Sequence, residues 1–111
     1  MDTVIVPLPD SVYKSQLAAL PYVVEMPYNQ VVRTYILRYL KHPKQLARLH
    51  CRANYYFPLF MDVFGKYNIP YELCYLAIIE SALNPMAQSP MGAAGIWQFM
   101  PSTGKLYGLE I

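Results

Sequence analysis

Glu80 is the residue whose type and position best suit acid–base chemistry. It follows an apolar run over residues 73–79, and a break at Asn84-Pro85 comes soon after it. Burial disfavours the charged form of a carboxyl, and the negative end of a helix dipole disfavours it again. A carboxyl buried in the last turn of a helix therefore keeps its proton near neutral pH, as a general acid must. We expect Glu80 to be a buried catalytic acid, against the ordinary interpretation of a solvated surface carboxylate.

The segment after Glu80, residues 88–101, combines small residues with one Trp and one Gln. Small residues let a backbone approach a ligand closely. Trp97 offers a flat apolar face for a sugar ring, and Gln98 offers a donor and an acceptor for hydroxyl groups. With a carboxylic acid nearby, these side chains favour glycoside chemistry over peptide or phosphate chemistry. The ordinary alternatives are a core role for Trp97 and loop-capping roles for Ser89 and Gln98.

Two motifs of the chain resemble the leading motifs of the lytic transglycosylase SLT domain. The first is Glu80-Ser81-Ala82-Leu83-Asn84-Pro85, and the second follows Ser89 and runs Gly92-Ala93-Ala94-Gly95-Ile96-Trp97-Gln98-Phe99-Met100-Pro101. Segments 25–30, 67–73 and 103–109 resemble the membrane-bound lytic murein transglycosylase D family. The resemblance covers most of the chain and implies an all-α, lysozyme-like fold of the SLT or goose type.

The resemblance also implies a role for each matching residue. Glu80 matches the single acid/base of the family, which protonates the glycosidic oxygen between N-acetylmuramic acid and N-acetylglucosamine. As a carboxylate it then takes the proton of the muramic C6 hydroxyl, so that a 1,6-anhydro ring closes, whereas most glycosidases use two carboxyl groups. The implied substrate-binding residues are Ser81, Ser89, Trp97, Gln98 and Met100. Ser81 follows the acid and helps fix the turn, and the Ser89 hydroxyl hydrogen-bonds near the catalytic carboxyl. The Gln98 amide contacts the glycan, and Trp97 and Met100 line the groove.

Helix signals predict an almost wholly helical chain. We expect helices over residues 10–20, capped by Asp10-Ser11, and over residues 30–40, capped by Asn29. A third begins at Pro43 and ends near residue 65, with Pro58 kinking or dividing it. The Glu80 helix should run from residue 70 to 83 or 84, and a short one from 101 to 107. In the second helix, Val31, Tyr35 and Tyr39 repeat at spacing four, and so do Val32 and Ile36 on an adjacent stripe. No segment alternates with period two, so no sheet is expected.

The resemblance divides the chain into an N-terminal helix and linker, residues 1–28, and the front part of an SLT catalytic domain, residues 29–111. The family's Ala-Tyr-Asn segment, whose tyrosine forms the other side of the site, does not follow residues 107–109. We therefore expect only the N-terminal part of the domain. The composition, 55% hydrophobic and 14% charged, agrees with apolar faces that await partner helices. A catalytically inactive murein-binding fragment, in which Glu80 and Gln98 grip glycan, is the first alternative.

The second alternative is a helical interaction module that uses a basic face. Every charge between Glu25 and Asp62 is positive, and Lys44, Arg48 and Arg52 recur at spacing four. Such a face can meet an anionic envelope surface, although a solvated helix face is the more common meaning. Nucleic acid is not expected, because the net charge is only +2 and no binding module is recognisable.

The expected partner is the glycan strand of peptidoglycan, and no cofactor or metal is expected. The spacing of His42, His50, Cys51 and Cys74 matches no metal-binding pattern, and both cysteines are expected to be buried thiols. The family implies the cell envelope, in the periplasm or at the outer membrane. The chain itself has neither the start of a signal peptide nor an apolar run long enough to span a bilayer.

Overall fold

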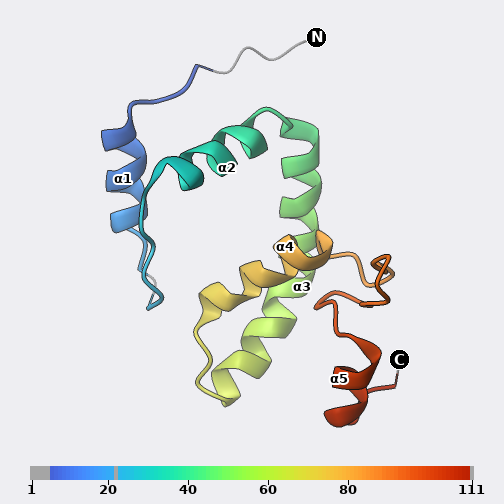
Figure 1. Cartoon of the computed structure of the whole chain (residues 1–111). Helices are drawn as coiled ribbons and strands as arrows, with labels where there is room; N and C mark the ends of the chain where they lie inside the picture. Colours follow the sequence, from blue (N-terminus) through green and yellow to red (C-terminus); the bar gives the residue numbers. More distant parts are fainter. Residues whose placement is uncertain (1–5, 22, 111) are drawn as a thin grey trace. The chain divides into compact units, whose positions relative to one another are not determined.

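The computed structural model describes residues 6–21 and 23–110, and its regular structure is helical (Figure 1). Its elements are α1 (Asp10–Ala18), α2 (Gln30–Leu40), α3 (Pro43–Lys66), the 3₁₀ helix η1 (Tyr71–Tyr75), α4 (Leu76–Ser81) and α5 (Pro101–Leu106). Within those described ranges the only β pairing consists of isolated bridges from Gln88 to Ala94 and from Ala94 to Phe99. The prediction of an all-α fold without a sheet is confirmed.

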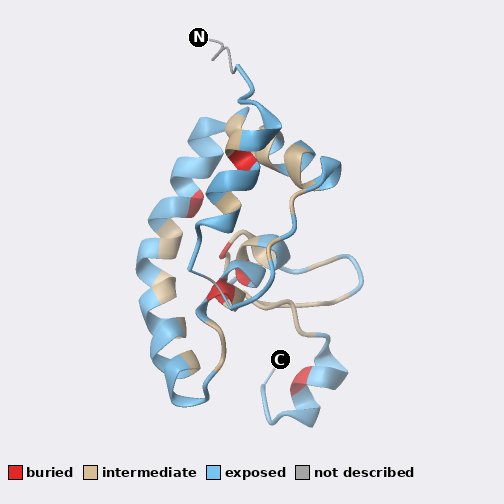
Figure 2. Cartoon of the chain, turned by 90° about the vertical axis from the view of Figure 1, so that its left-hand side faces the viewer, coloured by how far each residue is buried: buried red, intermediate tan, exposed pale blue. Residues whose placement is uncertain are grey.

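The chain divides into two compact units, Met1–Cys51 and Arg52–Ile111, and the boundary falls within α3. Each unit has a small buried core (Figure 2): Tyr13 and Leu49 in the first, Cys74, Ala77 and Leu83 in the second. The boundary predicted after residue 28 divides the chain in another way, because it separates an N-terminal helix and linker from the front part of the family's domain. That domain boundary stays a prediction.

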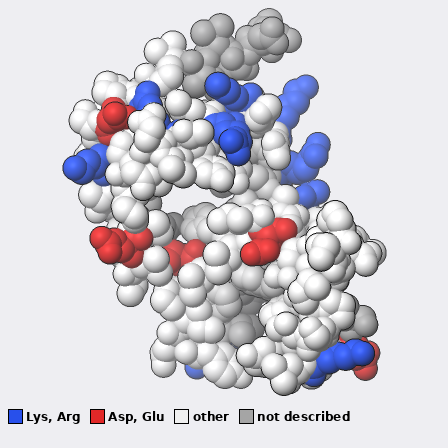
Figure 3. Space-filling view, viewed as in Figure 1, with Lys and Arg blue, Asp and Glu red and all other residues white. Residues whose placement is uncertain are grey.

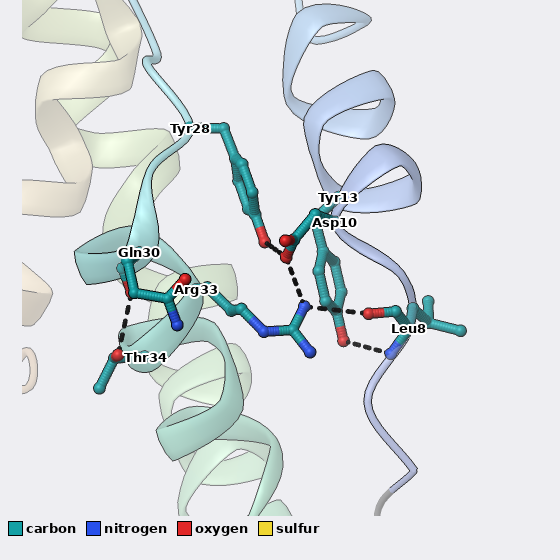
Figure 4. A network of polar contacts seen from close by, with 7 residues as sticks. All are labelled: Leu8, Asp10, Tyr13, Tyr28, Gln30, Arg33 and Thr34. Carbon is teal, nitrogen blue, oxygen red and sulfur yellow. Dashed lines mark hydrogen bonds and ion pairs between the residues drawn. The ribbon is translucent and has the colours of Figure 1, made fainter.

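A polar network in the first unit joins α1 to α2 (Figure 4). The Asp10 carboxylate accepts a hydrogen bond from the Tyr28 hydroxyl at 2.7 Å and pairs with the Arg33 guanidinium at 2.8 Å. Arg33 also donates to the Leu8 carbonyl at 3.0 Å. The predicted Asp10-Ser11 cap is wrong, because α1 follows Pro9 without a side-chain cap and Asp10 turns to these partners instead. The helix ends at Ala18, two residues earlier than expected.

Helix α2 begins and ends where the sequence predicted. The Asn29 side chain accepts a hydrogen bond from the Val32 amide at 2.9 Å and so caps the first turn. Val31 and Tyr35, on one of the two expected stripes, are 63% and 52% exposed. The stripe that packs is the adjacent one, through Val32 and Ile36, which are half-buried.

An open apolar pocket of about 470 Å³ lies between the helices of the first unit. Its lining comes from the segment before α1, from α1 and its end, and from α2: Val6, Leu8, Tyr13, Gln16, Leu17, Leu20, Ile36 and Leu40. The packed face of α2 therefore leaves apolar surface uncovered.

Helix α3 starts at Pro43 as predicted, and Pro58 lies inside it without dividing it. Its aromatic side chains form the framework of the second unit. Phe57 meets Tyr75 of η1 edge-on, with ring centroids 5.2 Å apart. Phe60 and Phe64 both contact Trp97. These contacts fix η1 and the long loop after α4 against the same helix.

The predicted single helix over residues 70 to 83 or 84 is wrong in two respects. Its first turn is the 3₁₀ helix η1, and α4 ends at Ser81. The next two residues, Ala82 and Leu83, take left-handed backbone angles, with φ of 53° and 59°. The last helix agrees with the sequence, since Pro101 begins α5 and Gly108, with φ of 79°, follows its end.

Candidate active site

Glu80 lies in the last turn of α4, and its side chain is exposed. The predicted burial of this carboxyl is therefore wrong. The reason is the direction of the buried stripe, which passes through the fully buried Ala77 to the half-buried Ser81, four residues on. Glu80 lies beside this stripe, and Ile79 next to it is 73% exposed. The Glu80 carboxylate makes no hydrogen bond or ion pair with another described residue.

Ser81 connects the two motifs of the sequence. Its hydroxyl donates to the Ile96 carbonyl at 2.7 Å and lies 3.1 Å from the Ala77 carbonyl in the preceding turn. A hydroxyl has one hydrogen to donate, and the shorter distance favours Ile96. The residue after the expected acid is thus attached to the loop that carries Trp97 and Gln98.

The turn after Ser81 is held from α3. The Arg52 guanidinium donates to the Ala82 carbonyl at 2.9 Å, across 30 residues of sequence. Leu83, the second left-handed residue, is fully buried. The sequence assigned Arg52 to a basic surface because of its spacing from Lys44 and Arg48. No local signal identified this contact, because it depends on how distant segments pack.

Ser89 and Gln98 both build the loop between α4 and α5. The Ser89 hydroxyl accepts from the Ala93 amide at 3.0 Å. The Gln98 side-chain amide donates to the Gly95 and Ala87 carbonyls at 2.8 and 3.1 Å. Gln98 itself has a left-handed φ of 51°. Both N–H groups of this amide are thus used within the loop, and its oxygen is the atom left for a ligand.

Trp97 packs against α3. Its ring centroid lies 4.8 Å from that of Phe60 and 6.0 Å from that of Phe64, and the residue is half-buried. Met100 is 41% exposed and immediately precedes α5. The structure therefore gives Trp97 a packing role and leaves Met100 open to solvent.

The structure also bears on the predicted basic face and on the two cysteines. Lys44 and Arg48 are exposed in the first unit, where the lysines and arginines gather (Figure 3). Arg52, in the second unit, is half-buried and engaged with Ala82. Cys51 is exposed, contrary to expectation, whereas Cys74 is buried and its burial raises the pKa of the thiol.

The described residues contain no group of three His, Cys, Asp or Glu side chains that could hold a metal ion. They also contain no helix with the length and apolarity that a membrane span requires. At the site itself, the exposed Glu80 carboxyl lies at a helix end, next to a loop held by hydrogen bonds to its backbone.

Comparison with known proteins finds similarity over the segment that contains both motifs. Residues 62–111 match the family model described as the transglycosylase SLT domain. Two proteins named membrane-bound lytic murein transglycosylase D, from Escherichia coli strains K12 and CFT073, are each 41% identical to this chain over 85 residues. The match covers 77% of this chain and 19% of each relative. The chain thus spans about a fifth of the length of these curated relatives.

Proposed function

We propose that this chain, whose residues 62–111 match the transglycosylase SLT domain, cleaves the glycan strands of peptidoglycan as a lytic transglycosylase. The observation that carries the proposal is the hydrogen bond from Ser81 to Ile96. It attaches the helix end that bears Glu80 to the loop that bears Gln98, so the carboxylate and the free amide oxygen belong to one ordered segment. The relatives' name supplies the substrate, murein.

In this proposal Glu80 acts first as an acid and then as a base. It protonates the glycosidic oxygen between N-acetylmuramic acid and N-acetylglucosamine, and the bond to the muramic C1 carbon breaks. The resulting carboxylate takes the proton of the C6 hydroxyl, whose oxygen attacks C1 and closes the 1,6-anhydro ring. One carboxyl group therefore returns to its starting state without water entering the reaction.

Because Glu80 is exposed in the free chain, we propose that the bound substrate itself shields the carboxyl from water. A strand that lies over the end of α4 excludes water from the Glu80 carboxyl and from the bond that breaks. We propose that the Gln98 amide oxygen accepts a hydrogen bond from a sugar hydroxyl or amide. Ser89 shapes the loop, Ser81 positions the acid, and Met100 and the accessible part of Trp97 provide apolar contact for the sugar rings.

The test is mass spectrometry of purified murein after incubation with this chain or with Glu80→Gln. Anhydro-muropeptides should appear with the parent, and the variant should lose about 10²- to 10⁴-fold of the rate. Glu110→Gln is the matched control, because it removes an exposed carboxylate outside both motifs and should leave the rate unchanged. Absence of anhydro products from the parent would refute lytic transglycosylation by this chain.

The exposed carboxylate also supports a second candidate, binding of murein without cleavage. Co-sedimentation with insoluble murein measures binding separately from cleavage. If the parent binds but does not cut, and Gln98→Ala releases it, the chain binds murein without cleaving it. If binding depends instead on Lys44 and Arg48, the chain is an interaction module that uses its basic face.

The cell envelope is the proposed location, because murein is found there and the relatives are named as membrane-bound. Fractionation of cells that produce the protein, followed by immunoblotting of soluble, periplasmic and membrane fractions, tests this assignment. Recovery only with the cytoplasmic fraction would contradict it.

A further inference from the structure

We propose that Arg52 is a positioning residue for Glu80, acting through the left-handed turn that ends α4. This inference rests on the proposed function in so far as Glu80 is the acid. Its structural content is independent: the conformation of residues 80–83 depends on a guanidinium from α3.

The turn is one that its own residue types do not favour. Ala82 and Leu83 are consecutive left-handed residues, with φ of 53° and 59°, and neither is Gly or Asn. A side chain with a Cβ atom rarely adopts this region, and such conformations persist only when the surrounding structure enforces them. Two strained residues directly after the Glu80-Ser81 pair therefore require contacts from outside the turn.

Two such contacts are present. Leu83 is fully buried, which anchors its side chain in the core of the second unit. The Arg52 guanidinium donates to the Ala82 carbonyl at 2.9 Å in a partly buried setting. A hydrogen bond from a charged donor is stronger than one between neutral groups, and an unpaired carbonyl in such a place is costly. Arg52 therefore favours the orientation of the Ala82 peptide that the left-handed turn presents.

Glu80 is placed by this arrangement. The Ala82 and Leu83 amides donate back to the Ile78 and Ala77 carbonyls at 2.9 and 3.3 Å, closing α4 around the Glu80 backbone. On one side Arg52 attaches the turn to α3, and on the other Ser81 attaches it to Ile96. Loss of the Arg52 contact lets the turn relax toward ordinary backbone angles, which moves Glu80 relative to the loop that carries Gln98.

The experiment compares Arg52→Met, which keeps the length of the side chain but removes its donors, with Arg52→Lys, which keeps one charged donor. Lys66→Met is the matched control, because it removes an exposed cation from the same helix. With soluble glycan strands as substrate, we expect Arg52→Met to lower kcat about 10- to 100-fold with little change in KM. Arg52→Lys should recover part of the loss, and Lys66→Met should behave as the parent.

A second measurement does not depend on activity. NMR spectra of the parent and of Arg52→Met report the amide resonances of Glu80, Ala82 and Leu83 and the side-chain carboxyl of Glu80. We expect these resonances to move in Arg52→Met, while those of α5 stay in place. Unchanged Glu80 resonances, or a kcat for Arg52→Met equal to that of the parent, would overturn the positioning role. If the parent cleaves nothing but the resonances move, the proposed function fails and the structural role of Arg52 stands.

Discussion

Ser81, Ser89 and Gln98 all direct their side chains to backbone groups of their own loop or of the adjoining helix turn. Residues that the family resemblance implies for substrate binding thus make hydrogen bonds that hold the backbone of the free chain. The Glu80 carboxylate differs, because it is exposed and makes no such hydrogen bond. At the scale of single residues, the motif separates into one group available for chemistry and several that hold the backbone around it.

The two cysteines should differ in reactivity in the folded protein. Cys51 is exposed, whereas Cys74 is buried and burial raises the pKa of its thiol above the ordinary 9.0. Because only the thiolate reacts rapidly, an alkylating reagent at mildly alkaline pH should modify Cys51 quickly and Cys74 only after unfolding. Intact-mass spectrometry over time, with and without denaturant, follows both reactions. Equal rates for both thiols in the native protein would contradict the burial of Cys74.

The raised pKa of Cys74 also means that this group makes the folded state less stable as the pH rises. The folded state binds the thiol proton more tightly than the unfolded state, so this contribution to stability is fully present below about pH 9 and declines as the pH rises through the folded value. In a Cys51→Ser variant, the Cys74 thiol should therefore become reactive only over the alkaline pH range in which the protein loses its structure.

Helix ends show which parts of the fold the sequence could predict. Asn29, Pro43, Pro101 and Gly108 act on backbone groups within one turn, and the helix boundaries they predict agree with the structure. The end of α4 was missed because the turn there is held by the burial of Leu83 and by the Arg52 hydrogen bond across 30 residues. The packed stripe of α2 and the exposure of Glu80 depend in the same way on which neighbours are present, so periodicity alone could not choose between adjacent faces.

The Asn29 cap should contribute to the stability of α2. Asn29→Ala removes the acceptor for the Val32 amide and should lower the free energy of unfolding by about 1 kcal/mol. Asn29→Asp keeps an acceptor oxygen and should stay close to the parent. Thermal unfolding followed by circular dichroism compares the three proteins. An unchanged midpoint for Asn29→Ala would show that the cap does not contribute to stability.

Both units leave large apolar side chains in solvent. The first exposes Val31 and Tyr35 together with the open apolar pocket, and the second exposes Leu59, Ile79 and Leu106, among others. Single exposed apolar residues are normal, whereas contiguous groups drive association. The hydrophobic residues that make up 55% of the chain are therefore found on its surface as well as in its core.

We expect the purified chain to bind a hydrophobic dye and to associate at high protein concentration, because uncovered apolar surface favours both. Sedimentation velocity over a range of concentrations measures the association. Replacing Val31 and Tyr35 by Lys should reduce dye binding without disturbing the core. A concentration-independent monomer that binds no dye would contradict this prediction.

The packing of Trp97 on Phe60 and Phe64 has an optical consequence. The chain contains one tryptophan and 11 tyrosines, so light absorbed by nearby tyrosines is re-emitted from a single indole at a known place. That place is the loop residue next to Gln98, in contact with α3. The protein therefore carries a built-in fluorophore beside its candidate site, whose emission colour reports whether a sugar or water lies next to the loop.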